Sequence, residues 1–224
     1  MAWSVDQIYS FTKFLVNKYQ SNTISAESLF YAWNSQQRMY ISDLIGRFQR
    51  NNNGKGAANT GLIENEVILT KLLPFTIPVT LTVTAGQATK PTGFIYNLAA
   101  RIDGEVVIMV NKSQWYFLNK TVIDPPSTSR GNYYATEYQN YYKILPSTVA
   151  SMDVDYITDC TDIVWGFILD GNGLPVYDPG SSTQPLWDNL SICEITQRTL
   201  KPYGLHFSSV DFENYGNSSI QTGN

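Results

Sequence analysis

Residues 165–180 read WGFILDGNGLPVYDPG, and residues 181–205 continue SSTQPLWDNLSICEITQRTLKPYGL. In the first part, two apolar runs over 164–169 and 174–177 flank the tetrapeptide Asp170-Gly171-Asn172-Gly173. These four residues adopt a positive φ at little steric cost, as a tight turn requires. The pattern therefore predicts a β-hairpin.

The second part has the signals of an amphipathic helix. Ser182 or Thr183 is placed to cap it, and Pro185 suits a first turn because its missing N–H would be unpaired there. Glu194 precedes Arg198 by four residues, the favourable order for a helical ion pair. We expect this helix to pack on its own hairpin and on a second partner. Its apolar face comprises Leu186, Leu190, Cys193 and Leu200 with Ile192 and Ile195 beside it, and its polar face comprises Asp188, Ser191, Glu194, Arg198 and Lys201.

Three more helices are predicted in the N-terminal third. Residues 4–20 begin with a capping-box pattern and continue with apolar residues at helical spacing. Ser25 can cap a second, longer helix whose apolar stripe runs from Leu29 to Phe48. A polar, glycine-rich loop is expected over 51–60, followed by a short helix over 64–75. The loop lacks a preceding strand and a Gly-Lys-Ser/Thr sequence, so we do not interpret it as a nucleotide-binding loop.

The middle of the chain changes to an alternating pattern, which is typical of half-buried strands. We expect a mostly antiparallel β-region that includes the hairpin at Trp165, together with a short helix over 112–120. The fold class is α+β: a helical hairpin with its loop over 1–60, an α+β domain over 61–206 and an extended tail over 207–224, integrated as one domain. The expected strands cover 77–84, 94–99, 106–110, 133–138, 142–145 and 152–157.

Composition restricts the function. The 224 residues are 43% hydrophobic and only 15% charged, with a net charge of −4. This composition is typical of a globular protein and lacks the basic footprint of a nucleic-acid-binding domain. Low charge density also suits a protein that buries surface in an assembly, because interface cores are depleted in charge. Cys160 and Cys193 have no paired spacing, so we expect two buried thiols.

Catalytic and metal-binding patterns are not found in the sequence. His206 is the single histidine, and we expect it to interact with the end of the C-terminal helix. Asp153 and Asp155 alternate on a predicted strand, and a solvated strand face is the favoured interpretation over a divalent-cation site. No signal peptide or membrane-spanning run is apparent. We therefore expect a non-enzyme with no cofactor and no metal.

The aromatic residues are the main candidates for an interaction surface. The chain has 15 Tyr, 10 Phe and 5 Trp, and aromatic side chains are enriched at interfaces. For the tyrosines between 133 and 142, packing inside the sheet is as good an interpretation as an interface, and sugar stacking is a third. The interface candidates are Trp33, Phe48, Tyr133, Tyr134, Tyr138, Tyr141, Trp187, Phe212 and Tyr215.

The C-terminal stretch also resembles a known family. Its apolar strand with a central Trp165, the Tyr177-Asp178 return, the helix near Trp187 and the final Gly204-Leu205 resemble head-to-tail connector (neck ring) proteins of crAss-like tailed phages. The resemblance extends in element order over most of the chain. It implies a structural, non-enzymatic protein of the virion neck that forms a homo-oligomeric, dodecameric ring.

The resemblance implies as partners the portal protein, other neck and tail rings, and genomic DNA that passes without specific binding. It also implies assembly in the host cytoplasm and no membrane association. Two other functions remain open from the residues alone: a carbohydrate-binding β-domain that uses exposed Tyr and Trp residues, and a hydrolase. The predicted N-terminal helices argue against the first, and the single histidine argues against the second. In the tail, isolated anchors such as Phe207, Phe212 and Tyr215 lead us to expect docking on a neighbouring subunit.

Overall fold

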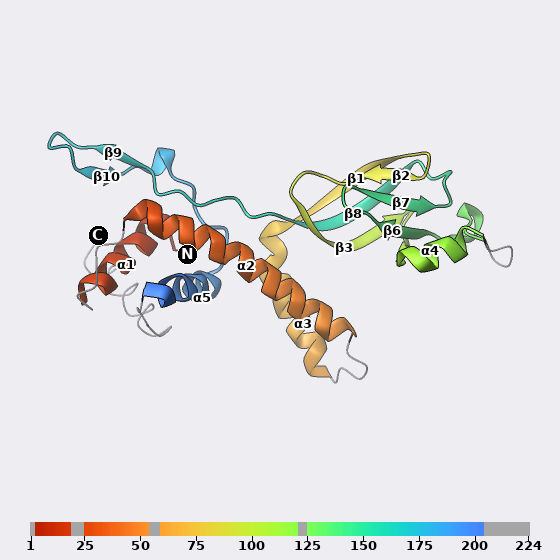
Figure 1. Ribbon diagram of the computed structural model, residues 1–224, viewed down its shortest axis with the longest axis horizontal. Coiled ribbons are helices and arrows are strands. Elements are labelled where there is room, and N and C mark those ends of the chain that lie inside the picture. The colour runs from red at the N-terminus through yellow and green to blue at the C-terminus, as the bar shows by residue number, and fades with distance from the viewer. Residues whose placement is uncertain (1–2, 19–24, 54–58, 121–124, 204–224) are drawn as a thin grey trace. The chain divides into compact units, whose positions relative to one another are not determined.

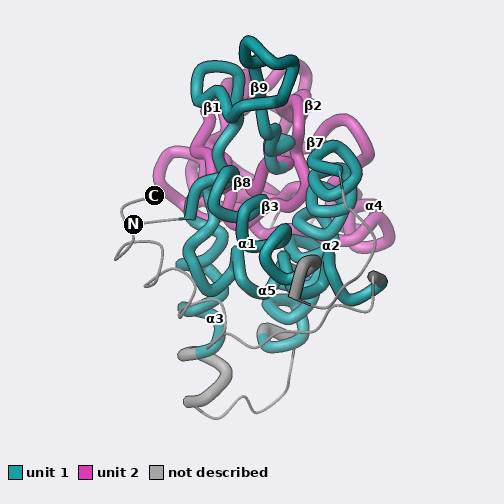
Figure 2. Tube along the Cα trace, turned by 90° about the vertical axis from the view of Figure 1, so that its left-hand side faces the viewer, with its two compact units in different colours: residues 1–74, 160–224 teal, residues 75–159 magenta. Residues whose placement is uncertain are grey.

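The computed structural model describes residues 3–18, 25–53, 59–120 and 125–203 (Figure 1). The fold is α+β, as predicted. The chain divides into two compact units, one formed by residues 1–74 with 160–224 and the other by residues 75–159 (Figure 2). These boundaries differ from those expected at residues 60 and 206, because α3 and the C-terminal hairpin and helix belong with the N-terminal helices. We call them unit 1 and unit 2.

Unit 1 is mainly helical. Its elements are α1 (Val5–Lys18), α2 (Ala26–Asn53), α3 (Asn59–Leu72), the hairpin strands β9 (Phe167–Leu169) and β10 (Pro175–Tyr177), and α5 (Asn189–Leu200). The predicted start signals are present: the Ser4 hydroxyl accepts from the Gln7 N–H at 3.2 Å, and the Gln7 carboxamide accepts from the Ser4 N–H at 2.9 Å. Ser25 accepts from the Ser28 N–H at 3.2 Å at the start of α2.

Two helix boundaries correct the sequence predictions. Helix α2 continues to Asn53 and α3 already begins at Asn59, so the expected loop over 51–60 is shorter, and residues 54–58 lie outside the described ones. Helix α5 begins at Asn189 with Asp188 as its cap, whose carboxylate accepts from the Leu190 N–H at 3.2 Å. Ser182 and Thr183 therefore do not cap this helix, and Pro185 lies before it. The predicted Glu194–Arg198 ion pair is confirmed at 2.9 Å.

The core of unit 1 lies where α2 packs against α3 and α5. Trp33 and Ile41 of α2 are buried together with Ile192 and Ile195 of α5, so the apolar stripe of α2 is covered inside the unit. Leu186 and Leu190 are 58% and 63% exposed, which corrects their expected place on the buried face. The late helix start explains Leu186, which precedes the first turn, whereas Leu190 lies in the first turn of α5 with its side chain exposed.

Unit 2 contains an eight-stranded sheet in the order β4-β3-β8-β1-β2-β7-β6-β5. All neighbours are antiparallel except β5 and β6. Contrary to expectation, the hairpin β9–β10 is not part of this sheet. The bounds are β1 (Thr76–Thr84), β2 (Gln87–Thr89), β3 (Phe94–Ile102), β4 (Glu105–Val106), β5 (Ile108–Met109), α4 (Lys112–Leu118), β6 (Tyr134–Glu137), β7 (Tyr141–Leu145) and β8 (Ser151–Thr158).

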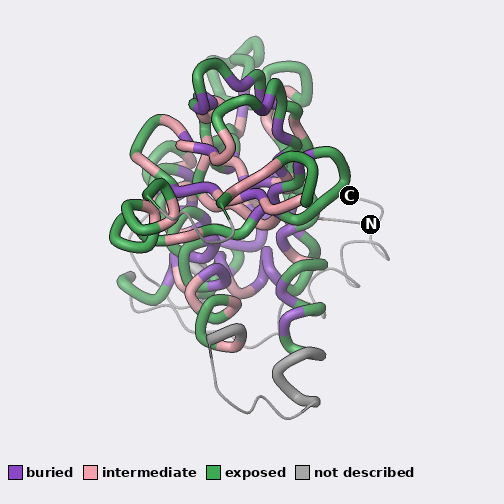
Figure 3. The backbone as a smooth tube through the Cα atoms, turned by 90° about the vertical axis from the view of Figure 1, so that its right-hand side faces the viewer, coloured by how far each residue is buried: buried purple, intermediate pink, exposed green. Residues whose placement is uncertain are grey.

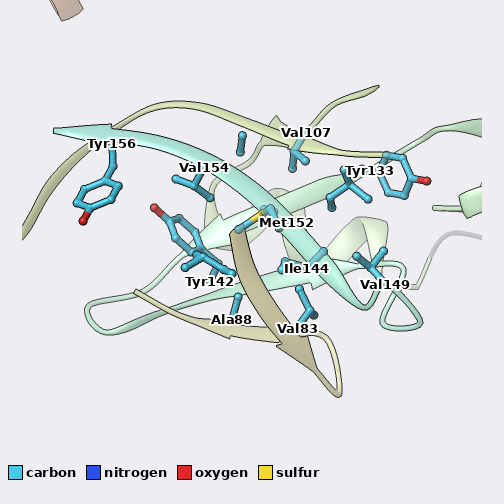
Figure 4. Packing of buried hydrophobic residues seen from close by; sticks show 14 residues of the cluster. Val83, Ala88, Val107, Tyr133, Tyr142, Ile144, Val149, Met152, Val154 and Tyr156 are labelled. Atoms are coloured by element: carbon cyan, nitrogen blue, oxygen red, sulfur yellow. The ribbon is translucent and has the colours of Figure 1, made fainter. Parts of the chain in front are cut away.

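Strand β1 joins the two halves of the sheet: residues 76–82 pair with β8, and residues 83–84 pair with β2. Side chains from both halves meet in one buried cluster, and Figure 4 shows Val83, Tyr142, Met152 and Val154 pointing into it. The alternation predicted from residue 77 is confirmed, because Leu81 and Val83 are buried while their neighbours are exposed. Figure 3 colours the backbone by burial, and buried and exposed stretches both occur along the chain. The predicted Asp103-Gly104 turn is also confirmed, with φ of 53° and 84°.

Candidate interaction surface

The hairpin of unit 1 is apolar on both faces. Ile168 pairs with Val176, and Phe167 pairs with Tyr177, so each pair points to one side of the two-stranded ribbon. We call residues 164–177 the arm. Its apolar side chains are Val164 (46% exposed), Phe167 (54%), Ile168 (59%), Leu169 (63%), Leu174 (61%) and Val176 (47%). A solvent-facing hairpin normally carries polar residues on at least one face. These six side chains are instead apolar and remain 46–63% exposed in the described part of the chain.

The tip of the arm is ordered by its own hydrogen bonds. The Asp170 carboxylate accepts from the N–H groups of Asn172 and Leu174 at 2.9 and 2.8 Å. Gly173 takes a φ of 78°, a conformation that side chains other than glycine rarely adopt. The tetrapeptide therefore forms the predicted turn and fixes the register of the two strands.

The base of the arm is anchored to α1. The Trp165 ring lies 4.8 Å from the Tyr9 ring, and its N–H donates to the Asp6 carboxylate at 2.9 Å. Phe167 and Tyr177 stack on the same indole at 5.9 and 6.1 Å. The arm is thus held at a defined place on unit 1 while its outer side chains stay exposed.

Gly166 allows the chain to close on itself at this base. Its N–H donates to the Ser182 hydroxyl at 2.9 Å, and the same hydroxyl donates to the Asp178 carbonyl at 2.7 Å. A Cβ at position 166 would lie 2.6 Å from the carbonyl carbon of Ser181, too close for any larger residue. Hydrogen bonds from Ser181 and from the Gly180 N–H lower the pKa of Asp178 and so favour the ionised carboxylate at the base of the arm.

Two cavities lie on unit 1. One, of about 360 Å³, lies at the base of the arm, where Val164, Trp165 and Phe167 face Phe30 and Tyr31 of α2. The other, of about 450 Å³, lies between α3 and the start of α5. Its lining residues are Glu66, Val67, Thr70, Lys71, Pro74 and Asp188. We call it the α3–α5 cavity.

The tryptophans proposed for the interface are core residues instead. Trp33 is 0% exposed and donates to the Thr196 hydroxyl at 3.1 Å, and Trp187 is 1% exposed and donates to the side-chain Oε1 of Gln37 at 3.3 Å. The sequence did not distinguish the two roles, because burial in a core and burial in an interface favour the same residue type. Phe48 is half-buried. Phe212 and Tyr215 lie outside the described residues.

The tyrosine cluster is divided between core and surface. Tyr133 is buried, and its hydroxyl donates to Asp103 at 3.0 Å, so it is not an interface residue of this chain. Tyr134, Tyr138 and Tyr141 are half-buried, and the rings of Tyr138 and Tyr141 stack at 4.8 Å. The ammonium groups of Lys112 and Lys143 lie 4.9 and 5.3 Å from the Tyr138 ring. Tyr141 and the two lysines thus occupy part of the surface of this ring within the monomer.

The polar clusters of the described residues hold the fold together. Tyr40 of α2 accepts from Lys71 of α3 and donates to Glu194 of α5, both at 3.0 Å. Asp153 accepts from Thr80 at 2.6 Å, and Asp155 pairs with Arg101 at 3.2 Å. Among the described residues, no group of three His, Cys, Asp or Glu side chains is placed to hold a metal ion. His206 lies outside the described residues, and Cys160 and Cys193 are both buried.

Sequence reasoning predicted the hairpin but missed the arm as a surface, and the missed residues are Phe167, Ile168, Leu169, Leu174 and Val176. The sequence contained a signal for this surface, because a two-stranded hairpin with no polar residue at alternate positions has no polar face to expose to solvent. Comparison with protein-family models finds no matching family, and comparison with curated proteins finds no significant match. In the described segments, no helix has the length and apolar character to cross a membrane.

Proposed function

We propose that the protein is a non-enzymatic structural subunit that assembles with copies of itself into a ring, and that this ring is a head-to-tail connector of a tailed phage virion. The observation that supports assembly is the arm. Six apolar side chains that are each 46–63% exposed lie within fourteen residues, on a hairpin that is fixed at its tip and at its base. A preordered apolar surface loses little conformational freedom when a partner covers it.

The position in the virion is proposed from the resemblance of the C-terminal stretch to neck ring proteins. The net charge of −4 suits a conduit, because phosphate groups passing through a ring of this protein would not be held by a basic lining. The portal protein and neighbouring neck or tail rings are the proposed partners, and the mature virion is the proposed location.

A second candidate function is carbohydrate binding, which the stacked Tyr138 and Tyr141 favour because sugar rings pack on aromatic faces. The two lysines at 4.9 and 5.3 Å from Tyr138 compete for the same ring, so this candidate ranks below assembly. A glycan-array screen with wild type and Tyr141→Ala tests it: binding that the substitution abolishes would favour this function.

Electron microscopy tests the proposed function. Purified protein at high concentration should form closed rings with a central opening, and an antibody against the protein should label virions at the junction of head and tail. Label on the capsid surface or on tail fibres, or particles without ring closure, would contradict the connector assignment.

A further inference from the structure

We propose that the arm of one copy docks into the α3–α5 cavity of the next copy, so that the ring is built from one repeated head-to-tail contact. This inference rests on the proposed function and names the contact that would carry it out. The partner is a second copy of this chain, because the chain itself offers both an exposed apolar projection and a separate cavity with Val67 and Pro74 in its lining.

The two surfaces lie at different places on unit 1. The base of the arm shares a cavity with Phe30 and Tyr31 of α2, whereas the α3–α5 cavity is linked to α2 through the hydrogen bond between Lys71 and Tyr40. Ten residues of helix separate these points, a distance of about 15 Å along the axis. The arm also points away from α3 (Figure 1). It therefore leaves the cavity of its own subunit open.

The cavity offers apolar surface beside charged and polar side chains, because Val67 and Pro74 line it together with Glu66, Thr70, Lys71 and Asp188. Val67 is 52% exposed in its wall, and Leu186 and Leu190, each two residues from Asp188, are 58% and 63% exposed. Its volume of about 450 Å³ leaves room for the side chains of the tip residues Leu169 and Leu174. Contact between the exposed leucine and valine side chains of the arm and Val67 would remove apolar surface of both from water.

The exposed area is sufficient for a specific contact. The exposed fractions of the six arm residues correspond to roughly 500 Å² of apolar surface, at the upper end of the largest patch on a typical monomer. A specific interface buries about 800 Å² on each partner. The arm alone thus supplies more than half of one side. A contact between two different patches is heterologous, and repetition of such a contact closes into a ring when the rotation between copies allows it.

Three matched substitutions test this docking. Ile168→Arg places a charge on the arm, Val67→Arg places one in the cavity wall, and Phe117→Arg places one on an exposed aromatic of unit 2 that is 78% exposed. Circular dichroism and thermal melting first establish that each variant is folded, and sedimentation velocity at tens of micromolar then gives its mass. We expect the first two variants to be monomeric and the Phe117→Arg control to assemble like wild type.

The decisive sample is an equimolar mixture of the Ile168→Arg and Val67→Arg proteins. Each mixed pair keeps one intact arm and one intact cavity, so the mixture should form one-to-one dimers and nothing larger. A Val67→Arg protein that assembles normally, or a mixture that remains monomeric, would overturn the docking while leaving ring assembly through the arm intact. A wild-type protein that is monomeric at every concentration would overturn the proposed function as well.

Discussion

The unfolding free energy of a Trp33→Ala variant shows whether Trp33 is a core residue or an interface residue. The indole of Trp33 is fully buried among α2 and α5, and its N–H donates to the Thr196 hydroxyl at 3.1 Å. The substitution therefore leaves a cavity of nearly a whole indole and removes one buried hydrogen bond.

The expected loss of unfolding free energy is about 3–5 kcal/mol, because a large aromatic side chain is removed from a packed core. At about 2–4 °C for each kcal/mol in a chain of this size, the melting midpoint should fall by roughly 6–20 °C. Trp33→Phe keeps most of the ring volume but loses the hydrogen bond and leaves a small cavity, so it should cost about 1–3 kcal/mol, less than Trp33→Ala.

Urea unfolding followed by circular dichroism measures both variants on the monomer. Tyr31→Ala is the matched control on the same helix, because Tyr31 is 81% exposed and its loss should change the free energy by less than about 0.5 kcal/mol. A Trp33→Ala protein that unfolds like wild type but fails to assemble would refute the burial argument and return Trp33 to the interface.

Three other substitutions or fragments test separate parts of the structure. Gly166→Ala should displace the base of the arm at a cost of about 1–3 kcal/mol, since the new Cβ would meet the Ser181 backbone, and assembly measured by light scattering should fall while the α-helical content is kept. Tyr142→Phe should leave stability at pH 7 unchanged or raise it by about 1 kcal/mol, because the buried Tyr142 hydroxyl has no hydrogen-bond partner within the described segments. Burial raises the pKa of Tyr142 in the folded protein, so wild type should lose stability as the pH rises above about 10, and Tyr142→Phe should lose less in urea titrations at pH 9 and 11. The fragment 75–159 should fold alone with a cooperative melt, and a fragment with no near-native dichroism would contradict the division into two units.

The sequence was informative where local signals decide the structure. Alternation located the strand from Thr76 to Thr84, and the Asp170–Gly173 tetrapeptide located the turn of the arm. Capping signals located α1 and α2. Each of these signals acts within a few residues, so neighbouring residues alone are enough to predict the structure from it.

The start of α5 was missed because three residues competed for one role. Ser182 and Thr183 are good helix caps, yet here Ser182 bridges Gly166 and Asp178, and Thr183 bonds with Val164 across the base of the arm. Asp188 was left as the cap. Tertiary hydrogen bonds overrode the local preference, and no pattern along the chain shows such bonds.

The place of the hairpin was missed for a related reason. Hydrophobic periodicity predicts that a strand exists, but it does not say which sheet the strand joins. The same limit applies to the aromatics: Tyr133 and Tyr138 belong to one cluster in the sequence, but Tyr133 is buried beside Asp103 and Tyr138 lies half-exposed on Tyr141. Which of these tyrosines is buried depends on the tertiary packing of the unit 2 sheet around its core.

Native mass measurement of wild type beside the Ile168→Arg variant determines whether the exposed arm joins copies of this chain. We expect one closed oligomer of many copies for wild type and a folded monomer of 25.2 kDa, within the small mass change of the substitution, for the variant. Equal mass distributions for the two proteins, whether both monomeric or both assembled, would contradict this expectation.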